Sequence, residues 1–200
     1  VGTDISAEEL IEEVEKDRVF YDQSGGGVTF SGGEPLLQHE FLLAVLEGCK
    51  RRHIHSATDT SGYAPPDVLE RVAAVTDLFL YDLKCIDDAR HREFTGVSNE
   101  LILENLRRLM KRGNHVIVRI PVIPGINDRE EELYRAGAFI ASLERIQEVH
   151  LLPYHTSGAA KYERVGKAYS LKTLQKPDSE QLKALAGQLT TYLPRVIIGG

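Results

Sequence analysis

The sequence predicts one α/β domain, a barrel or open barrel of parallel strands covered by helices. Short apolar, strand-like runs alternate with longer segments of helical period. At 200 residues, of which 42% are hydrophobic, the chain can bury one substantial core. No internal repeat or interdomain linker divides it, so we expect a single domain over residues 1–200. A doubly wound sheet would give a similar one-dimensional pattern.

The helices are predicted from capping residues and from apolar residues at helical spacing. Ser6 and Glu9 can form a capping box for a first helix that runs to about Lys16. After a turn that follows the fourth strand, Asp128 and Glu131 can cap another helix. The other expected helices span about residues 38–52, 66–74, 99–112 and 179–192.

The strands are predicted from short apolar runs bounded by glycine, proline or polar residues. They span residues 28–30, 56–58, 78–81, 116–122, 148–152 and 196–198. The segment 154–177 is the longest without clear periodicity, and loops of that length often have a function.

Composition excludes several classes of function. A formal net charge of −6 argues against affinity for nucleic acid or for an anionic membrane. No apolar run is long enough to span a bilayer and no secretion signal is recognisable, so we expect a cytoplasmic protein. Cys49 and Cys85 are too far apart for a metal motif, and Cys49 lies on an apolar helical stripe that predicts burial.

Polar residues lie at or just after the carboxyl ends of five successive predicted strands. They are Glu34, Asp59, Asp82 with Lys84, Arg119 and His155. Because the carboxyl ends of parallel strands converge on one face of a barrel, these side chains predict a single pocket. Any one of them alone would be interpreted as a strand-end charge facing water, but five in register favour a site.

The glycine-rich segment 24–34 does not match a nucleotide motif. It lacks the Lys-Ser/Thr pair of a P-loop, and its glycines flank a strand where the dinucleotide fingerprint would follow one. Gly32 and Gly33 can let the backbone approach a ligand, and Glu34 could accept a hydrogen bond from an ammonium group. The alternative is a glycine turn that binds nothing.

Several segments, in order, resemble the glycyl-radical-enzyme activating enzymes, the radical SAM family that includes the pyruvate formate-lyase activating enzyme. They are SGGGVTFSGGEPLLQ (24–38), ATDTSG (57–62), DLFLYDLK (77–84), TGVSN (95–99), VRIPVIPGIND (118–128) and LLPYH (151–155). Together they extend over nearly the whole chain, which makes the resemblance far more specific than any one motif.

The resemblance implies a partial TIM-like barrel that binds S-adenosylmethionine (SAM) beside a [4Fe–4S] cluster. By motif, Gly32, Gly33 and Glu34 resemble the element that holds the methionine amino group. Asp82, Leu83 and Lys84 match the segment that contacts SAM, and Arg119 and His155 match positions that complete its site. Asp59, Thr60 and Asp82 match a place where the family can hold a monovalent cation.

The family cleaves SAM reductively to a 5′-deoxyadenosyl radical, which takes a hydrogen atom from a glycine loop of a partner glycyl radical enzyme. An electron donor such as flavodoxin or ferredoxin is implied. The family's CxxxCxxC cluster motif is absent from this sequence, and two cysteines cannot replace it. The resemblance therefore implies a barrel truncated at its N-terminus and inactive alone. Residues 16–21 resemble the subgroup with a ferredoxin-like insert.

Two other interpretations come from different functional classes. Lys84, beside Asp82 at a strand end, would suit a cluster-free barrel lyase that forms a Schiff base with a carbonyl substrate. Alternatively, the domain would be a non-catalytic module that binds a partner's glycine loop.

Overall fold

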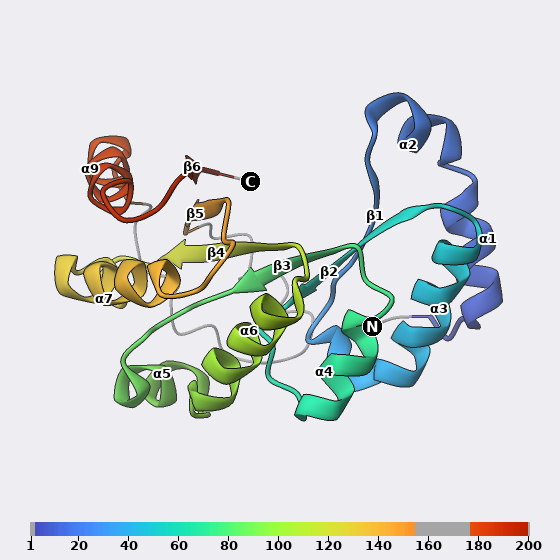
Figure 1. The fold of residues 1–200 in the computed structure, drawn as a ribbon, viewed down its shortest axis with the longest axis horizontal. Coiled ribbons are helices and arrows are strands. Elements are labelled where there is room, and N and C mark those ends of the chain that lie inside the picture. Colours follow the sequence, from blue (N-terminus) through green and yellow to red (C-terminus); the bar gives the residue numbers. More distant parts are fainter. Residues whose placement is uncertain (1–2, 155–176, 200) are drawn as a thin grey trace.

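The computed structural model describes residues 3–154 and 177–199, and its centre is one parallel sheet. The strands are β1 (Gly27–Phe30), β2 (His55–Thr60), β3 (Leu78–Asp82), β4 (Val116–Val122), β5 (Val149–Pro153) and β6 (Val196–Ile198). They lie side by side in sequence order (Figure 1). Within the described residues β1 and β6 do not pair with each other, so the sheet stays open. The predicted open barrel of parallel strands is confirmed.

The first two helices precede β1, and the other described helices lie between successive strands (Figure 1). They are α1 (Ala7–Glu15), α2 (Arg18–Ser24), the 3-10 turn η1 (Pro35–Gln38), α3 (His39–Arg51), α4 (Pro66–Ala73), α5 (Asp88–Thr95), α6 (Glu100–Arg112), α7 (Glu130–Ala141) and α9 (Ser179–Leu189). Helices α2 and α5 were not predicted. The reason is physical: α2 buries no residue and α5 buries only His91, so neither has an apolar stripe.

Successive side chains along the strands alternate between the hydrophobic core and the opposite face of the sheet. In β4 the side chains of Val116, Val118, Ile120 and Val122 are buried in the main hydrophobic core, whereas Ile117, Arg119 and Pro121 between them are partly exposed. In β3, Phe79 and Tyr81 join the same core. Because successive side chains in a strand point to opposite faces, Asp82 and Arg119 face away from this core, on the other side of the sheet.

The two capping predictions have different outcomes. The capping box is confirmed: Ser6 Oγ accepts the N–H of Glu9 at 3.2 Å, and the Glu9 carboxylate accepts the N–H of Ser6 at 2.8 Å. The prediction for Asp128 is wrong, because α7 begins after Arg129, whose side chain makes no capping bond. Asp128 Oδ1 instead accepts the N–H of Gly125 at 2.8 Å. The carboxylate therefore stabilises the turn before α7 and does not cap the helix.

Both cysteines are free and buried. Cys49 packs with Val14 and Ile54, which confirms its predicted packing role. Burial raises the pKa of the Cys85 thiol to about 11. In the part of the chain that the structure describes, each helix is too short or too polar to cross a bilayer.

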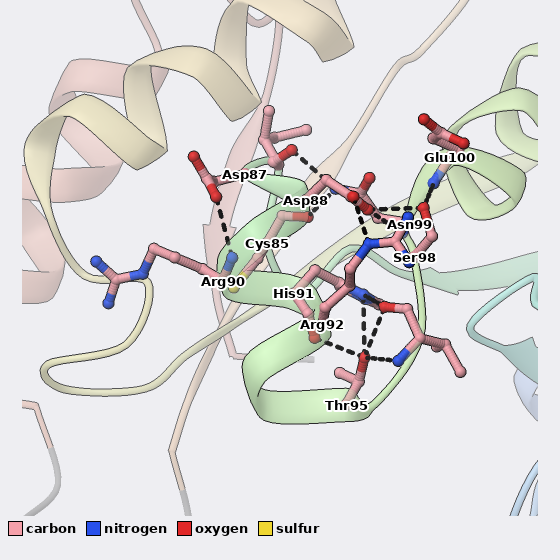
Figure 2. Close-up of polar contacts among 12 residues, drawn as sticks. Cys85, Asp87, Asp88, Arg90, His91, Arg92, Thr95, Ser98, Asn99 and Glu100 are labelled. Atoms are coloured by element: carbon pink, nitrogen blue, oxygen red, sulfur yellow. Dashed lines mark hydrogen bonds and ion pairs between the residues drawn. The ribbon is translucent and has the colours of Figure 1, made fainter.

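Asp88 organises the segment between β3 and α6 (Figure 2). Its Oδ1 accepts the Ser98 hydroxyl at 2.7 Å and the backbone N–H of Asn99 at 2.9 Å, and its Oδ2 accepts Arg92 Nε at 2.7 Å. His91 Nδ1 lies 2.9 Å from the carbonyl oxygen of Val97. The TGVSN segment thus folds back against α5.

These hydrogen bonds predict a pH-dependent stability. The bond from Arg92, followed by those from Ser98 and the Asn99 backbone, lowers the pKa of Asp88 from 3.8 to about 2. Since the folded pKa lies below the unfolded one, the stabilisation is present above pH 3.8 and is lost as the pH falls towards 2. We expect Asp88→Asn to lower the urea midpoint at pH 6, and the difference from the unmodified protein to shrink below pH 4.

The control is Glu93→Gln, which changes the charge of the same helix at a side chain for which no hydrogen bond or ion pair is found within the described residues. It should leave the midpoint nearly unchanged at both pH values. A gap between Asp88→Asn and the unmodified protein that stays constant across the acid range would contradict the assignment.

Candidate functional site

Three strands meet at the guanidinium group of Arg119. Its Nε donates to Asp82 Oδ1 at 2.9 Å and its Nη2 to the same oxygen at 2.7 Å. Nη2 also donates to Asp59 Oδ1, although Asp59 is 60 residues away in sequence. Asp82 and Arg119 are direct partners in the register of β3 and β4. The predicted convergence of strand-end charges is therefore present for these residues.

The cluster is largely buried and, with Lys84 nearby, combines two carboxylates with two cationic groups. The side chain of Arg119 is 16% exposed and those of Asp59 and Asp82 are each 23% exposed. Burial raises the pKa of Asp82, although Arg119 and Lys84 act in the opposite direction. Burial also opposes the charge of Arg119, but Asp82 and then Asp59 outweigh it and raise its pKa. Groups of both signs are thus gathered at one place, where they can match a ligand that carries both a positive and a negative charge.

Glu34 is hydrogen-bonded through both of its carboxylate oxygens, and its predicted contact with SAM stays a prediction. Its Oε1 accepts the Thr60 hydroxyl at 2.5 Å and the N–H of Leu36 at 3.2 Å, and its Oε2 accepts the N–H and the hydroxyl of Ser61 at 3.0 and 2.6 Å. A carboxylate has about four acceptor positions, and these bonds use them. Glu34 therefore ties the start of η1 to the end of β2.

The positions of Gly32 and Gly33 leave space where a side chain would lie. A Cβ atom placed on either residue would meet no heavy atom within 4 Å, and Gly32 has a φ of +153°. Ser31, just before them, donates from its hydroxyl to Asp59 Oδ2 at 3.2 Å. The loop after β1 thus lies against the carboxylate cluster.

The remaining predicted residues follow β3 and β5. Leu83 is buried, and its N–H donates to the carbonyl of Arg119 at 2.8 Å, which continues the sheet. Lys84 is partly buried and near enough to Asp82 to lower the pKa of that carboxyl group. His155 lies outside the described residues. The predicted cation site stays a prediction: Arg119 bridges Asp59 and Asp82, and Thr60 donates to Glu34.

Three residues that make hydrogen bonds in the site were not predicted from the sequence. Ser31 and Ser61 bond to the site carboxylates, and Asn127 donates to the carbonyl of Lys84 at 2.6 Å. Each looked like an ordinary turn residue. Their only sequence signal is that they lie within or beside the same motif segments as the predicted residues.

An open parallel barrel with a charged site at its strand ends is the architecture of radical SAM enzymes. Residues 1–136 match the family model described as Radical SAM superfamily. The chain is 46% identical over 188 residues to the trans-4-hydroxy-L-proline dehydratase activating enzyme of Clostridioides difficile, covering 92% of this chain and 62% of that protein. It is 42% identical over 190 residues to the choline trimethylamine-lyase activating enzyme of Oleidesulfovibrio alaskensis, covering 92% and 61%.

A solved structure agrees with these matches. The crystal structure of a domain of pyruvate-formate lyase-activating enzyme from Bacteroides vulgatus superposes with a TM-score of 0.75 at 38% identity, covering 88% of this chain and 99% of that one. The chain belongs to the radical SAM superfamily and, within it, to the family of glycyl-radical-enzyme activating enzymes. It spans about three fifths of the length of the first two relatives.

The site residues fit SAM but not the cluster of the family. The methionine part of SAM is a zwitterion, which the carboxylates of Asp59 and Asp82 and the cations of Lys84 and Arg119 can match at its two charged groups. Iron–sulfur clusters are held by several thiolates. The sequence has two cysteines, both buried, and burial raises the pKa of each thiol. Cluster ligation by these cysteines is therefore disfavoured.

Proposed function

We propose that this chain is the SAM-binding core of a glycyl-radical-enzyme activating enzyme. The observation that supports this most is the junction of Asp59, Asp82 and Arg119 at the ends of three strands, in a chain of this family. When bound, SAM and a reduced [4Fe–4S] cluster supply the radical chemistry that removes a hydrogen atom from a glycine of the partner enzyme.

The residues of the chain bind and orient the cofactor. Asp59 and Asp82 accept hydrogen bonds from the amino group of SAM. Lys84 and Arg119 pair with the carboxylate of SAM, and the missing side chains of Gly32 and Gly33 leave space beside the cluster. Charge-assisted hydrogen bonds in a partly buried site are the strong class, so these contacts fix the methionine end of SAM.

The cluster ligands are proposed to come from outside this sequence. The edge of β1 that faces away from β2 pairs with no strand in the described part. Beside it lies a mainly apolar cavity, lined by residues of α1, β1 and α3 that include Leu10, Phe30, Phe41 and Leu42. An unpaired edge next to apolar side chains can accept a further strand, and we propose that a cluster-bearing segment pairs there.

The partner is proposed to be a glycyl radical enzyme presenting its glycine loop, with flavodoxin or ferredoxin as the electron donor. The relatives are named for partners with different chemistry, a dehydratase and a lyase, so their names do not single out one partner for this chain. We also propose a cytoplasmic location, since free buried cysteines suit a reducing compartment.

The test is SAM cleavage by the full-length protein. After reconstitution with iron and sulfide and reduction with dithionite, we expect 5′-deoxyadenosine to form, and a glycyl radical signal in electron paramagnetic resonance when the partner is added. Residues 1–200 treated identically should give neither product. The proposal fails if the reconstituted full-length protein leaves SAM intact, or if residues 1–200 cleave it robustly alone.

A further inference from the structure

The hydrogen-bond ladder between β3 and β4 ends at Pro121. The N–H of Leu83 donates to the carbonyl of Arg119 at 2.8 Å. In a parallel ladder the next bond would run from residue 121 back to β3, but proline has no N–H to donate. The backbone that follows Leu83, beginning with Lys84, therefore needs another means of attachment to β4.

Asn127 provides that attachment. Its Nδ2 donates to the carbonyl of Lys84 at 2.6 Å and to the carbonyl of Pro121 at 2.6 Å, while its Oδ1 accepts the N–H of Ile123 at 2.7 Å. The residue is 2% exposed. Both amide hydrogens thus join the exits of two strands at the point where the backbone ladder stops.

Two more buried polar side chains hold the residues just beyond Lys84. Asn99 Nδ2 donates to the carbonyls of Cys85 and Ile86 at 3.0 and 2.8 Å. Glu132 accepts the N–H of Ile86 and, at 3.3 Å, that of Asp87. Burying an amide or a carboxylate costs free energy unless its hydrogen bonds are made, and these groups use them on one short stretch of backbone. That stretch is therefore strongly fixed.

We propose that Asn127 is a positioning residue that sets the direction of the Lys84 side chain at the SAM site. The inference rests on the proposed function, because Lys84 is expected to pair with the carboxylate of SAM. Asn127 acts only through the backbone of Lys84. Without Asn127 the lysine would still be present, but its side chain could adopt other directions. Ordering that side chain when SAM binds would then weaken the affinity for SAM.

The experiment is a double-mutant cycle on the full-length protein, with the Kd for SAM measured by equilibrium dialysis and the thermal midpoint measured without SAM. Asn127→Ala should raise the Kd about tenfold, a value within the range of coupling between contacting residues. In a Lys84→Ala background, the same change should alter the Kd by less than about twofold. The matched control is Asn114→Ala, which removes a similar bond, from Nδ2 to the carbonyl of Ala73 at 2.9 Å, just before β4 at its opposite end.

Each result has a distinct meaning. If Asn127→Ala and Asn114→Ala change the Kd equally, or if Asn127→Ala has its full effect without Lys84, the positioning role is refuted. If Lys84→Ala weakens binding but Asn127→Ala does not, the inference alone fails. If the unmodified protein does not bind SAM, the proposed function fails as well. Should Asn127→Ala not fold, Asn127→Ser, which keeps one donor, replaces it, with a smaller rise in Kd expected.

Discussion

Replacing Asp82 by asparagine should raise the Kd for SAM at least about 30-fold, since removing one member of a desolvated charge pair costs about 2 kcal/mol or more. Asp82 contributes to the negative charge that is proposed to hold the amino group, and its side chain is only 23% exposed. Asparagine keeps the shape of the side chain and can still accept a hydrogen bond from Arg119 Nε. The rise in Kd therefore measures the loss of the negative charge. The measurement is equilibrium dialysis of SAM against the full-length protein.

The same substitution should not lower thermal stability at neutral pH. Burial raises the pKa of Asp82, so its ionised form costs the folded state free energy above the ordinary pKa. A residue retained despite such a cost is typical of a functional site. The control is Asp67→Asn, which removes the same charge from the exposed first turn of α4. Equal affinities for the two variants would contradict the assignment of Asp82.

Gly62→Ala should destabilise the protein by about 3 kcal/mol or more, through overpacking and a left-handed backbone. Gly62 has a φ of +73°, and a Cβ atom there would lie 1.8 Å from the hydroxyl oxygen of Tyr81. That ring cannot move easily, because Tyr81 is fully buried and its hydroxyl donates to the carbonyl of Ile102 at 2.6 Å. Urea unfolding measures the change.

Gly96→Ala is the matched control for this prediction. Gly96 has a φ of +82°, but a Cβ atom there would meet no heavy atom within 4 Å. It should therefore show only the backbone cost, roughly 1 to 2 kcal/mol. If both variants lose the same stability, the close contact with Tyr81 has no energetic weight, and the turn after Thr60 and Ser61 is less rigid than the structure indicates.

The features that were predictable from the sequence are those with a period or a fixed position relative to a strand. The apolar run 116–122 predicted β4, and the alternating burial in the structure then places Arg119 on the face away from the core. Asp59 and Asp82 were predicted as site residues because each lies at the carboxyl end of a strand. The parallel pairing of β2, β3 and β4 places both at the same end of the sheet. These predictions needed only the rule that carboxyl ends of parallel strands share one face.

Hydrogen bonds between loops were not predictable, because they have no sequence period. Glu34 finds its partners at Thr60 and Ser61, 26 and 27 residues further on, and nothing local indicates that pairing. Asn127 lies in a Pro-Gly turn, where asparagine is common for local reasons. Only the folded backbone shows that its amide takes over where Pro121 ends the ladder.

A crystal structure of the full-length, cluster-loaded protein with SAM is the most direct measurement of the central claim. We expect the amino group of SAM within hydrogen-bond distance of Asp59 or Asp82, and its carboxylate within hydrogen-bond distance of Lys84 or Arg119. SAM bound with none of these four side chains in contact would contradict the assignment of the strand ends as its site.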